Sequence, residues 1–504
     1  MNRSFPIILL ACLVISASSL PLKVCKSRPK SGTNTGQENI IKRVNQPLPN
    51  VFAKIREINK GIINRKHQLI HGDILKREGR YAIDCESCLW PKSEDGTINV
   101  PYILDSIYTP DEQNQILTAM QEFNSLTCVR FVPRNDELSY LRILSEDGCA
   151  SYAGQIGGTQ PLQLQASYGC LYRGIIQHEL NHALGFFHEN ARADRDQYII
   201  INHENIANGY EPGFSIVDGN NLSLPYDYSS VMHFDKYAYT SNDLPTIKPT
   251  PDPNVPIGQR DGLSVLDVAK INKLYNCNVC STLLNTPSGN FSSPNYPSNY
   301  PNNMNCVWLI RTPNGQVSLT FKDFRLLNSM DCASDYINIY DGPSTTSPKI
   351  VKLCGSKQLP EIIGSNNQML IEFVSGSLTT SAGFSASYKT VQCGRTYFDA
   401  TNIITSPGYS SGSYLPNLNC NYIINAQPGY RITITGNYEI EQTMYCKDDK
   451  LTIYSNGIVG SPKYLFCGKG SLLVKSLNNT LLMNFQSDPY YHKKGFNLTY
   501  WTYQ

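Results

Sequence analysis

The sequence has little excess charge of either sign and, after its first residues, no long apolar run. Its 43 basic and 41 acidic residues leave a formal net charge of +2, which is too small to attract the phosphates of nucleic acid or an anionic membrane. No apolar stretch reaches the ~20 residues that a helix needs to cross a bilayer. These absences predict neither a nucleic-acid partner nor a membrane span.

The N-terminus carries a short export signal. Arg3 is followed by an apolar run from Phe5 to Ile15 and then by small residues up to Ser19, in the order of a cleaved secretory signal. We assign residues 1–19 to this signal. The protein is therefore expected to be secreted and extracellular, with secretory granules as its store before release.

Cysteine usage also indicates export. Sixteen cysteines in a secreted chain favour disulfides over thiolate metal sites, because the oxidising compartment stabilises the bridge. Cys12 lies in the signal and Cys25 precedes residue 81, so fourteen cysteines remain from Cys85 onward and permit seven bridges. Spacing alone does not fix which cysteines pair.

At 504 residues the chain is long enough for about three domains. Residues 20–80 are polar and basic, and they end in "ILKREGR", with Arg80 directly before Tyr81. We predict a propeptide here, removed by an activating protease that cleaves after Arg80. Residues 81–279 mix helical patterns such as "PDEQNQILTAMQEFNSLT" with strand patterns such as "YLRILS", which predicts an α+β domain.

The chain after Cys280 has a different composition. Short β-branched or aromatic runs alternate there with clusters of Gly, Pro, Asn and Ser, as in all-β domains. The tract also repeats, because each half carries four cysteines at similar spacing. This pattern predicts two tandem β-sandwiches, at residues 280–390 and 393–504.

Three of the eight histidines lie within eleven residues, in "QHELNHALGFFHEN". On a helix, His178 and His182 lie one turn apart on the same face, so both imidazoles can reach one ion, with Glu179 beside them. Gly185 can end the helix in a left-handed conformation and turn the chain so that His188 supplies a third nitrogen. Three histidine ligands leave one position open, as in a catalytic zinc site. Three unrelated histidines on a buried helix are the alternative.

A zinc ion held in this way would lower the pKa of its water towards ~7 and polarise the scissile carbonyl of a peptide. Glu179 would take the proton of the water and pass it to the leaving amine. The predicted activity is zinc-dependent hydrolysis of peptide bonds.

The stretch "HELNHALGFFHE" resembles the signature of the astacin zinc peptidases, HExxHxxGxxH followed by Glu. "YDYSSVMHF" resembles the Met-turn of that family, and "RADRDQYI" and "IGQRDGLSVLDVAKINKLYNC" are astacin-like too. The two repeats resemble CUB domains. The resemblance implies an α+β, metzincin-like zinc-peptidase domain followed by two all-β CUB sandwich domains, with one zinc ion per catalytic domain.

One position departs from the astacin pattern. The Met-turn methionine, which lies under the zinc site in the family, is Met232, but the tyrosine expected two residues later is Phe234. In astacins that tyrosine binds zinc and hydrogen-bonds the tetrahedral intermediate, and losing one such donor costs about 3 kcal/mol of transition-state stabilisation. Tyr237 and Tyr239 follow, but neither is expected to replace it.

Two hypotheses therefore remain. An active secreted zinc metalloendopeptidase is favoured, because the three histidines and the glutamate that perform the water chemistry are intact. The alternative is a catalytically weakened or inactive astacin-like protein that acts as a CUB-mediated extracellular binding scaffold. Phe234 is its support in the sequence.

The propeptide contains a candidate inhibitory ligand. "LIHGDIL" resembles the astacin aspartate switch, which implies that Asp73 occupies the water position on zinc until processing. A plain Gly-Asp turn is the alternative. Cleavage after Arg80 would release the α-amino group of Tyr81, which in the family reaches an ionic network that includes the Glu after the third histidine, here Glu189.

The resemblance also implies how the cysteines pair. In the peptidase domain the implied pairs are Cys128–Cys277, Cys149–Cys170 and an N-terminal bridge, Cys85–Cys88, of the kind found in egg-hatching astacins. In the CUB repeats they are Cys280–Cys306, Cys332–Cys354, Cys393–Cys420 and Cys446–Cys467. The short "CESC" could instead be a redox or metal motif, but no second pair accompanies it.

Substrate should lie extended along an edge strand of the peptidase domain, and "YLRILSEDGCASYAG" is the expected edge. Backbone pairing at such an edge favours flexible protein segments. The order signal, propeptide, peptidase, CUB, CUB resembles that of hatching enzymes that digest egg envelopes. We predict extracellular protein substrates, with egg-envelope glycoproteins as the best candidate.

Surface glycans and a calcium ion are also predicted. Asn221, Asn290, Asn478 and Asn497 each begin an N-x-Ser/Thr sequon, so an exported chain can carry glycans there. Calcium-binding CUB domains resemble one another in three acidic positions. In the second repeat these positions hold Glu441, Asp449 and Asp488.

Carboxylates are hard oxygen ligands that suit Ca²⁺, and crowded carboxylates repel one another without an ion. The first repeat has Leu327, Asp335 and Gly376 at the matching positions. One carboxylate supplies too little charge, so calcium is expected in the second repeat only. A cluster of solvated loop acids is the alternative reading of the second repeat.

Overall fold

The computed structural model describes residues 55–56, 58–59, 69–76 and 88–504, the last range without residues 147, 218, 260, 458, 461 and 462. The predicted signal at residues 1–19, the cleavage point between Arg80 and Tyr81, and the cysteines Cys25 and Cys85 lie outside the described residues. Within the part of the chain that is described, no helix has the length and apolar character needed to cross a membrane.

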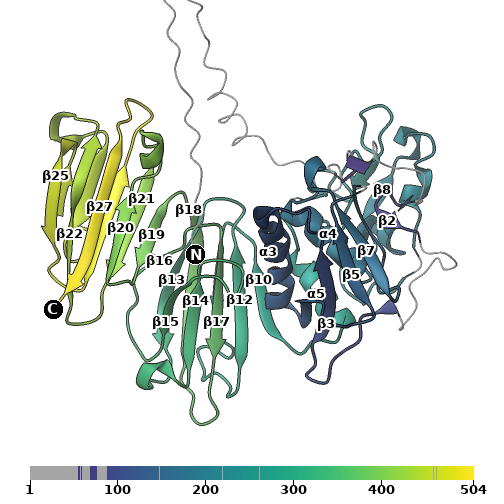
Figure 1. The fold of residues 1–504 in the computed structure, drawn as a ribbon, viewed down its shortest axis with the longest axis horizontal. Coiled ribbons are helices and arrows are strands. Elements are labelled where there is room, and N and C mark those ends of the chain that lie inside the picture. The colour runs from purple at the N-terminus through teal and green to yellow at the C-terminus, as the bar shows by residue number, and fades with distance from the viewer. Residues whose placement is uncertain are drawn as a thin grey trace, which may run out of the picture. The chain divides into compact units, whose positions relative to one another are not determined.

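A seven-stranded mixed sheet with the order β1-β2-β6-β7-β5-β3-β4 forms the framework of the first domain (Figure 1). The pairs β3–β4, β3–β5 and β5–β7 are parallel, and β6 is antiparallel to β7. The strands are β1 (Leu69–Ile70), β2 (Ile74–Leu75), β3 (Ile98–Leu104), β4 (Val129–Pro133), β5 (Tyr140–Leu144), β6 (Cys149–Ser151) and β7 (Thr159–Leu164).

Two of the α-helices in this domain start at capping boxes. Three α-helices have described bounds: α3 (Pro110–Leu126), α4 (Arg173–Ala183) and α5 (Val265–Leu274). At the start of α3, the Thr109 side chain accepts from the backbone N–H of Glu112, and the Glu112 carboxylate accepts from the N–H of Thr109. Ser264 and Asp267 form the same capping box at α5.

Helix α4 differs from the other two because every residue from Gly174 to Ala183 is buried. A helix without a solvent face has to satisfy its polar side chains inside the protein. The histidines of the "QHELNH" stretch therefore lie in the core, where other protein groups or an ion must be their partners.

Residues 69–76 cover the edge of the sheet. β1 and β2 form a tight hairpin, and β2 adds to β6 in parallel, with Ile74 opposite Ser151. The backbone N–H of Ser151 also donates to the carbonyl of Asp73 (3.1 Å). The edge expected at residues 140–154 is wrong for its first half, because β5 lies inside the sheet between β7 and β3.

The second half of the first domain is mostly irregular. It contains a two-stranded sheet of β8 (Ile199–Ile201) and β9 (Ile247–Pro249). An apolar cluster around Phe214, Phe234 and Tyr239 forms its core. The short 3-10 helices of the domain are η2 (Ala166–Tyr168), η3 (Glu189–Ala191), η4 (Arg195–Gln197), η5 (His203–Asn205) and η6 (Glu211–Phe214).

Two β-sandwiches follow, and their topology is the same (Figure 1). The first pairs a five-stranded sheet, β10-β12-β17-β14-β15, with a four-stranded sheet, β11-β18-β13-β16. The second pairs β19-β21-β26-β23-β24 with β20-β27-β22-β25, which is the same order once strands are matched along the chain. The predicted fold class, an α+β domain followed by two all-β sandwiches, is confirmed.

The strands of the first sandwich are β10 (Cys280–Leu284), β11 (Ser288–Ser292), β12 (Asn305–Arg311), β13 (Gln316–Arg325), β14 (Tyr336–Tyr340), β15 (Lys349–Leu353), β16 (Ile362–Ile363), β17 (Gln368–Val374) and β18 (Gly383–Val391). Those of the second are β19 (Gly394–Tyr397), β20 (Thr401–Thr405), β21 (Asn419–Asn425), β22 (Arg431–Ile440), β23 (Lys450–Tyr454), β24 (Lys463–Phe466), β25 (Gly468–Lys475), β26 (Thr480–Gln486) and β27 (Gly495–Tyr503). Short 3-10 helices connect them: η7 (Met330–Cys332), η8 (Tyr409–Ser411) and η9 (Met444–Cys446).

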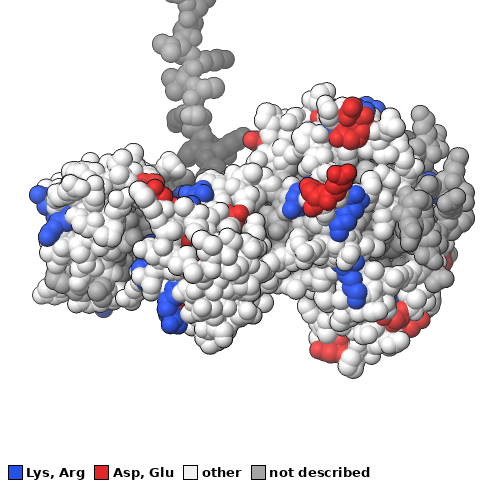
Figure 2. Space-filling view, turned by 90° about the horizontal axis from the view of Figure 1, so that it is seen from below, with Lys and Arg blue, Asp and Glu red and all other residues white. Residues whose placement is uncertain are grey.

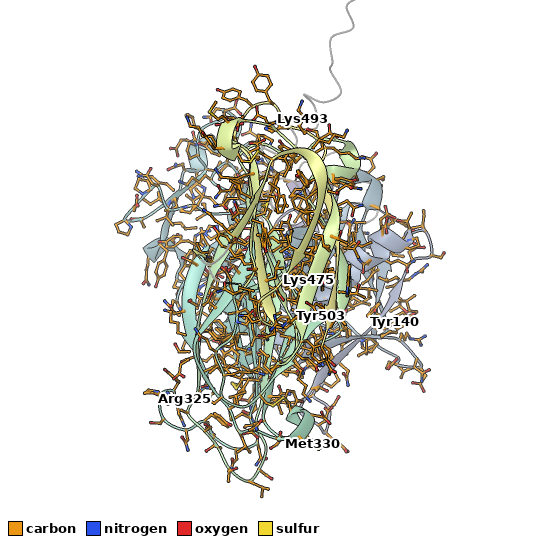
Figure 3. The ribbon with its side chains drawn as sticks, turned by 90° about the vertical axis from the view of Figure 1, so that its left-hand side faces the viewer. Tyr140, Arg325, Met330, Lys475, Lys493 and Tyr503 are labelled. Atoms are coloured by element: carbon orange, nitrogen blue, oxygen red, sulfur yellow. A yellow bond between two sulfur atoms is a disulfide. The ribbon has the colours of Figure 1, made fainter. Side chains whose placement is uncertain are left out.

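Each sandwich has an aromatic core of its own. In the first, Trp308 and Phe384 meet edge to face with ring centroids 5.4 Å apart. In the second, Phe485 and Phe496 meet in the same way at 5.3 Å, a geometry that stabilises a core beyond the burial of apolar area. Figure 3 shows the second sandwich with side chains and labels Tyr503 at the end of β27.

The described residues contain six disulfides, and these are pairs that the resemblance implies. Cys88 is disulfide-bonded as well, and Cys85, its predicted partner, lies outside the described residues. The six are Cys128–Cys277, Cys149–Cys170, Cys280–Cys306, Cys332–Cys354, Cys393–Cys420 and Cys446–Cys467.

Charged side chains are scattered over one face of the protein. On the face drawn in Figure 2, basic and acidic side chains lie in small separate groups among uncharged ones. This distribution agrees with the formal net charge of +2. The four sequon asparagines are also exposed: Asn221, Asn290, Asn478 and Asn497.

Candidate active site

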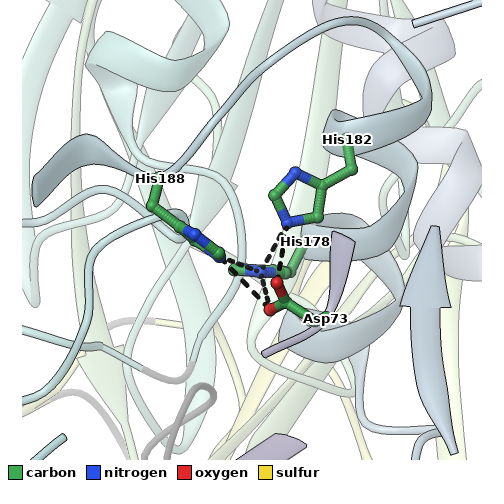
Figure 4. Close-up of side chains that lie close together, drawn as sticks. All are labelled: Asp73, His178, His182 and His188. Atoms are coloured by element: carbon green, nitrogen blue, oxygen red, sulfur yellow. Dashed lines mark hydrogen bonds and ion pairs between the residues drawn. The ribbon is translucent and has the colours of Figure 1, made fainter. Parts of the chain in front are cut away.

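Three imidazoles converge on one point beside α4 (Figure 4). His178 and His182 lie one turn apart on the helix, and their Nε2 atoms are 3.1 Å apart. The Nε2 atom of His188 is 3.3 Å from that of His178. All three side chains are buried, so the nitrogens face one another in a space without bulk water.

Gly185 makes the arrangement possible. α4 ends at Ala183, and Gly185 has φ of 104°, a left-handed conformation that side chains rarely adopt. Its backbone N–H donates to the carbonyl of His182 (2.8 Å). The chain reverses here and returns His188 to the face of the helix, as the sequence predicts.

Backbone carbonyls orient two of the rings. The Nδ1 atom of His178 is 2.9 Å from the carbonyl oxygen of Val231, and that of His182 is 2.7 Å from the carbonyl oxygen of Phe186. A carbonyl partner keeps the proton on Nδ1 and leaves the Nε2 lone pair for a ligand. Burial lowers the pKa of His188 to about 3, so this ring is also neutral at physiological pH.

Asp73 completes the cluster. Its Oδ2 atom lies 3.0 Å from Nε2 of His178 and 3.2 Å from Nε2 of His188, and its Oδ1 atom lies 3.6 Å from Nε2 of His182. Burial alone would raise the pKa of Asp73, but the three imidazoles that surround its carboxylate hold this pKa well below its usual range. Three imidazoles and one carboxylate around a common centre fit the donor set and number of a tetrahedral zinc ion.

Glu179 lies beside this cluster. Its side chain is fully buried, and neither carboxylate oxygen has a hydrogen-bond partner among the described residues. Burial raises the pKa of Glu179 well above its usual range, and the nearby charge of Asp73 adds to the effect. Burying a carboxylate without hydrogen bonds is costly, which points to a chemical role rather than a structural one.

The turn that contains Met232 is anchored on helix α5. The carboxylate of Asp267 accepts from the Ser230 hydroxyl (2.6 Å) and from the backbone N–H of Val231 (2.9 Å). The carbonyl of Val231 in turn holds the ring of His178. Met232 is buried in the main core of the domain. Asp267 was not predicted as a site residue, because its visible signal in the sequence is only its place in a helix cap.

Phe234 fills the space next to the histidines. It is fully buried, and its ring centroid is 4.6 Å from that of His188. The phenyl ring occupies the volume, as expected, but its side chain carries no polar atom that could donate a hydrogen bond.

Glu189 lies in an ion-pair network. Its carboxylate contacts Lys270 Nζ (2.5 Å) and Arg192 Nη1 (3.1 Å), and it accepts from the backbone N–H of Asp227 (2.8 Å). Burial raises the pKa of Glu189, an effect that Lys270 opposes. Tyr81, the expected partner of Glu189, lies outside the described residues.

Two residues to which the sequence analysis gave no role at the site contact the segment at the sheet edge. Asn59 Nδ2 donates to the carbonyls of Gly72 (2.9 Å) and Cys149 (2.7 Å). The hydroxyl of Tyr239 donates to the carbonyl of His71 (3.1 Å). No local pattern marks either contact, because the groups that meet are far apart in the sequence.

A second cluster of ligand atoms lies in the second β-sandwich. Glu441, Asp449 and Asp488 each bring a carboxylate oxygen to within 4.8 Å of the others. Oε2 of Glu441 is buried without a hydrogen-bond partner among the described residues. Burial raises the pKa of Glu441, and the charges of Asp449 and Asp488 add to the effect. These are the conditions under which a bound cation is favourable.

An α+β domain with a buried HExxH helix, a third histidine beyond a glycine turn and a methionine turn beneath defines a metzincin-type metallopeptidase, here followed by two β-sandwiches. The family model of the astacin peptidases matches residues 86–276, and the model of the CUB domain matches residues 280–388 and 393–500.

Relatives agree with this assignment. The chain is 45% identical over 516 residues to embryonic protein UVS.2 of Xenopus laevis, covering 99% of both chains. It is 47% identical over 350 residues to the astacin-like metalloendopeptidase of Coturnix japonica, covering 69% of this chain and 85% of that one. A solved structure, high choriolytic enzyme 1 from Oryzias latipes, a hatching enzyme zinc-protease, is 47% identical, covers 39% of this chain and 100% of its own, and has a TM-score of 0.38.

The chain therefore belongs to the astacin family of metalloendopeptidases and carries two CUB domains. Astacins are zinc-dependent, and the cluster of three histidines is the part of this chain that suits the metal.

Proposed function

We propose that this protein is a secreted endopeptidase, made in a latent form, that uses His178, His182 and His188 as zinc ligands and Glu179 as its general base and acid. The single observation that carries the proposal is the convergence of three imidazoles around one point beside a buried carboxylate that has no hydrogen-bond partner among the described residues. We expect residues 1–19 to direct secretion and residues 20–80 to act as a propeptide.

The zinc ion would supply a Lewis acid that acidifies water and polarises the scissile carbonyl. Glu179 accepts the proton of the attacking water and donates it to the amine of the leaving peptide. One side chain therefore serves as both the base and the acid of the hydrolysis. Val231 and Phe186 keep the imidazoles of His178 and His182 oriented through their carbonyls. Burial excludes bulk water, which strengthens each of these interactions.

The edge of the sheet suggests where substrate binds. In the latent form, β2 pairs with β6, and the carboxylate of Asp73 lies among the three imidazoles. We infer that an extended substrate replaces this segment along β6, which favours flexible stretches of a protein chain. Extracellular proteins, and egg-envelope glycoproteins in particular, are the substrates that we propose for the mature enzyme.

The zinc centre is tested with Glu179→Gln. The mature wild-type protein should contain one zinc per chain and cleave unfolded protein, and a chelator should stop the cleavage. Glu179→Gln should keep its zinc but lose at least ~10³-fold in kcat, because the proton acceptor is gone. The matched control, Glu204→Gln, changes an exposed glutamate and should act like wild type. Absence of zinc from the wild-type protein would refute the proposal.

Latency is tested with Asp73→Ala in the uncleaved proform. Removing the carboxylate should let the proform cleave substrate before any activating protease has cut after Arg80, because the fourth ligand position opens. The control Asp105→Ala changes a carboxylate outside the cluster. A mutant proform as silent as wild type would show that Asp73 does not inhibit. Isolated egg envelopes, incubated with the mature enzyme, test the proposed substrate separately.

A further inference from the structure

Tyr239 carries a hydroxyl group near Phe234, whose phenyl ring has none. Tyr239 belongs to the same aromatic cluster as Phe234, and their rings meet edge to face at 6.0 Å. The Tyr239 ring also stacks on Tyr210 at 4.7 Å. Only 7% of Tyr239 is exposed, so packing on both sides fixes where its hydroxyl points.

The hydroxyl points at the segment that carries Asp73. It donates to the backbone carbonyl of His71 at 3.1 Å. His71 precedes Asp73 by two residues, and its ring stacks on that of His188 with centroids 5.8 Å apart and planes 26° apart. The acceptor is therefore a main-chain carbonyl of the segment that runs past the metal-binding histidines.

Both partners hold unusual backbone conformations. Tyr239 has φ of 54° and His71 has φ of 54°, in the left-handed region that bulky residues rarely adopt. Such a conformation costs on the order of 1 kcal/mol and persists where the surrounding structure requires it. For Tyr239, this conformation accompanies a hydroxyl that reaches the backbone carbonyl of His71.

We propose that Tyr239 is a substrate-binding residue: once the propeptide leaves, its hydroxyl donates to a backbone carbonyl oxygen of the extended substrate next to the scissile bond. The inference rests on the proposed function, since it concerns the same cleft. Burial raises the pKa of Tyr239 far above its usual range, and the charge of Asp73 adds to this effect. The hydroxyl therefore stays protonated and can donate a hydrogen bond. A main-chain acceptor is present in every peptide, so the contact holds substrate without selecting a side chain.

The first test measures binding and needs no turnover. A peptide of residues 55–76 is titrated into zinc-loaded, mature Glu179→Gln protein, which cannot cleave it. Adding Tyr239→Phe should weaken binding about three- to tenfold, the effect of one neutral hydrogen bond. The matched control is Tyr237→Phe, since Tyr237 is 48% exposed and two residues away. This control should bind like the parent.

The second test identifies the acceptor. An ester in place of the amide between His71 and Gly72 makes the His71 carbonyl a poorer acceptor. The factor by which the ester weakens binding should be at least about threefold larger for the protein with Tyr239 than for the Tyr239→Phe protein. An equal loss in both proteins would overturn the assignment of the contact, whatever the zinc centre does.

The third test is kinetic. In the mature enzyme, Tyr239→Phe should raise KM for a long peptide about three- to tenfold with little change in kcat, because the hydrogen bond is made in the bound substrate as well as in the transition state. An unchanged KM would overturn the proposal while the zinc-dependent activity stands. A wild type without activity would instead refute the proposed function, and the binding test would still decide the role of Tyr239.

Discussion

The two CUB domains share one framework and differ in what that framework holds. In the first CUB domain, the Tyr300 hydroxyl donates to Oδ2 of the buried Asp335. The backbone N–H of Leu327 donates back to the Tyr300 hydroxyl (3.1 Å), and that of Gly376 donates to Oδ1 of Asp335 (2.8 Å). One tyrosine and one aspartate thus fasten two loops of the first domain together.

The second domain repeats these contacts atom for atom. The Tyr414 hydroxyl donates to Oδ2 of Asp449. The backbone N–H of Glu441 donates to the Tyr414 hydroxyl (3.0 Å), and that of Asp488 donates to Oδ1 of Asp449 (2.7 Å). Leu327 therefore occupies the place of Glu441, and Gly376 that of Asp488.

The acids of the two CUB domains have two different roles. The buried aspartate holds the loops in both domains, so it is structural even where no ion is expected. In the first domain, the Ser334 hydroxyl donates to Oδ1 of Asp335 (2.8 Å) and takes part of the space of a ligand. In the second CUB domain, the carboxylates of Glu441 and Asp488 add negative charge to the cluster. Burial raises the pKa of Glu441, and the charges of Asp449 and Asp488 raise it further. We expect the side chains of Glu441 and Asp488 to decide whether calcium binds.

The largest expected effect comes from removing one of these outer acids. The mature wild-type protein should bind one Ca²⁺ through its second CUB domain, with an affinity typical of extracellular modules, Kd of about 10⁻⁴ to 10⁻³ M. Asp488→Ala should weaken binding at least about tenfold, because a charged ligand is lost. Calorimetry on the full chain measures this, with the exposed Asp399 changed to Ala as control. Binding that survives Asp488→Ala would place the ion elsewhere.

A smaller effect should separate the buried aspartates. Asp449→Asn and Asp335→Asn each disturb a hydrogen bond from a tyrosine and one from a backbone N–H. Each variant should lose about 1–3 kcal/mol of unfolding free energy, as for other buried hydrogen bonds. Thermal unfolding in chelator measures this loss. Added calcium should stabilise the Asp335→Asn protein as much as wild type, but the Asp449→Asn protein less; equal responses would contradict the assignment.

Local patterns predicted much of the candidate site. His178 and His182 share one helix, and His188 follows six residues after His182, so helix geometry and one glycine were enough to bring them together. The acidic positions of the second CUB domain followed from the resemblance to calcium-binding CUB domains, and the internal repeat showed that the first copy lacks two of them. The histidines needed only neighbouring residues, whereas the acids needed knowledge of the domain family.

Contacts between distant segments could not be predicted in this way. Tyr239 and His71 are 168 residues apart, and Asp267 reaches the Met232 turn from another element. The position of β5 inside the sheet depends on which parallel strands pair, and the pattern of one strand does not contain that information. Packing of the whole domain decides these contacts.

The smallest expected effect is a gain of function in the first CUB domain, and it is the most direct test of the comparison. If the two outer side chains alone decide calcium binding, Leu327→Glu together with Gly376→Asp should create a second site. A Cβ atom on Gly376 would lie 2.4 Å from the Ser334 hydroxyl oxygen, so Ser334→Ala must accompany the pair. The triple variant should bind two Ca²⁺ per chain, the new one weakly, with Kd of about 10⁻³ M. Ser334→Ala alone is the matched control and should bind one. A triple variant that folds, keeps its unfolding temperature and still binds one ion would show that the loops of the second domain contribute more than their acids.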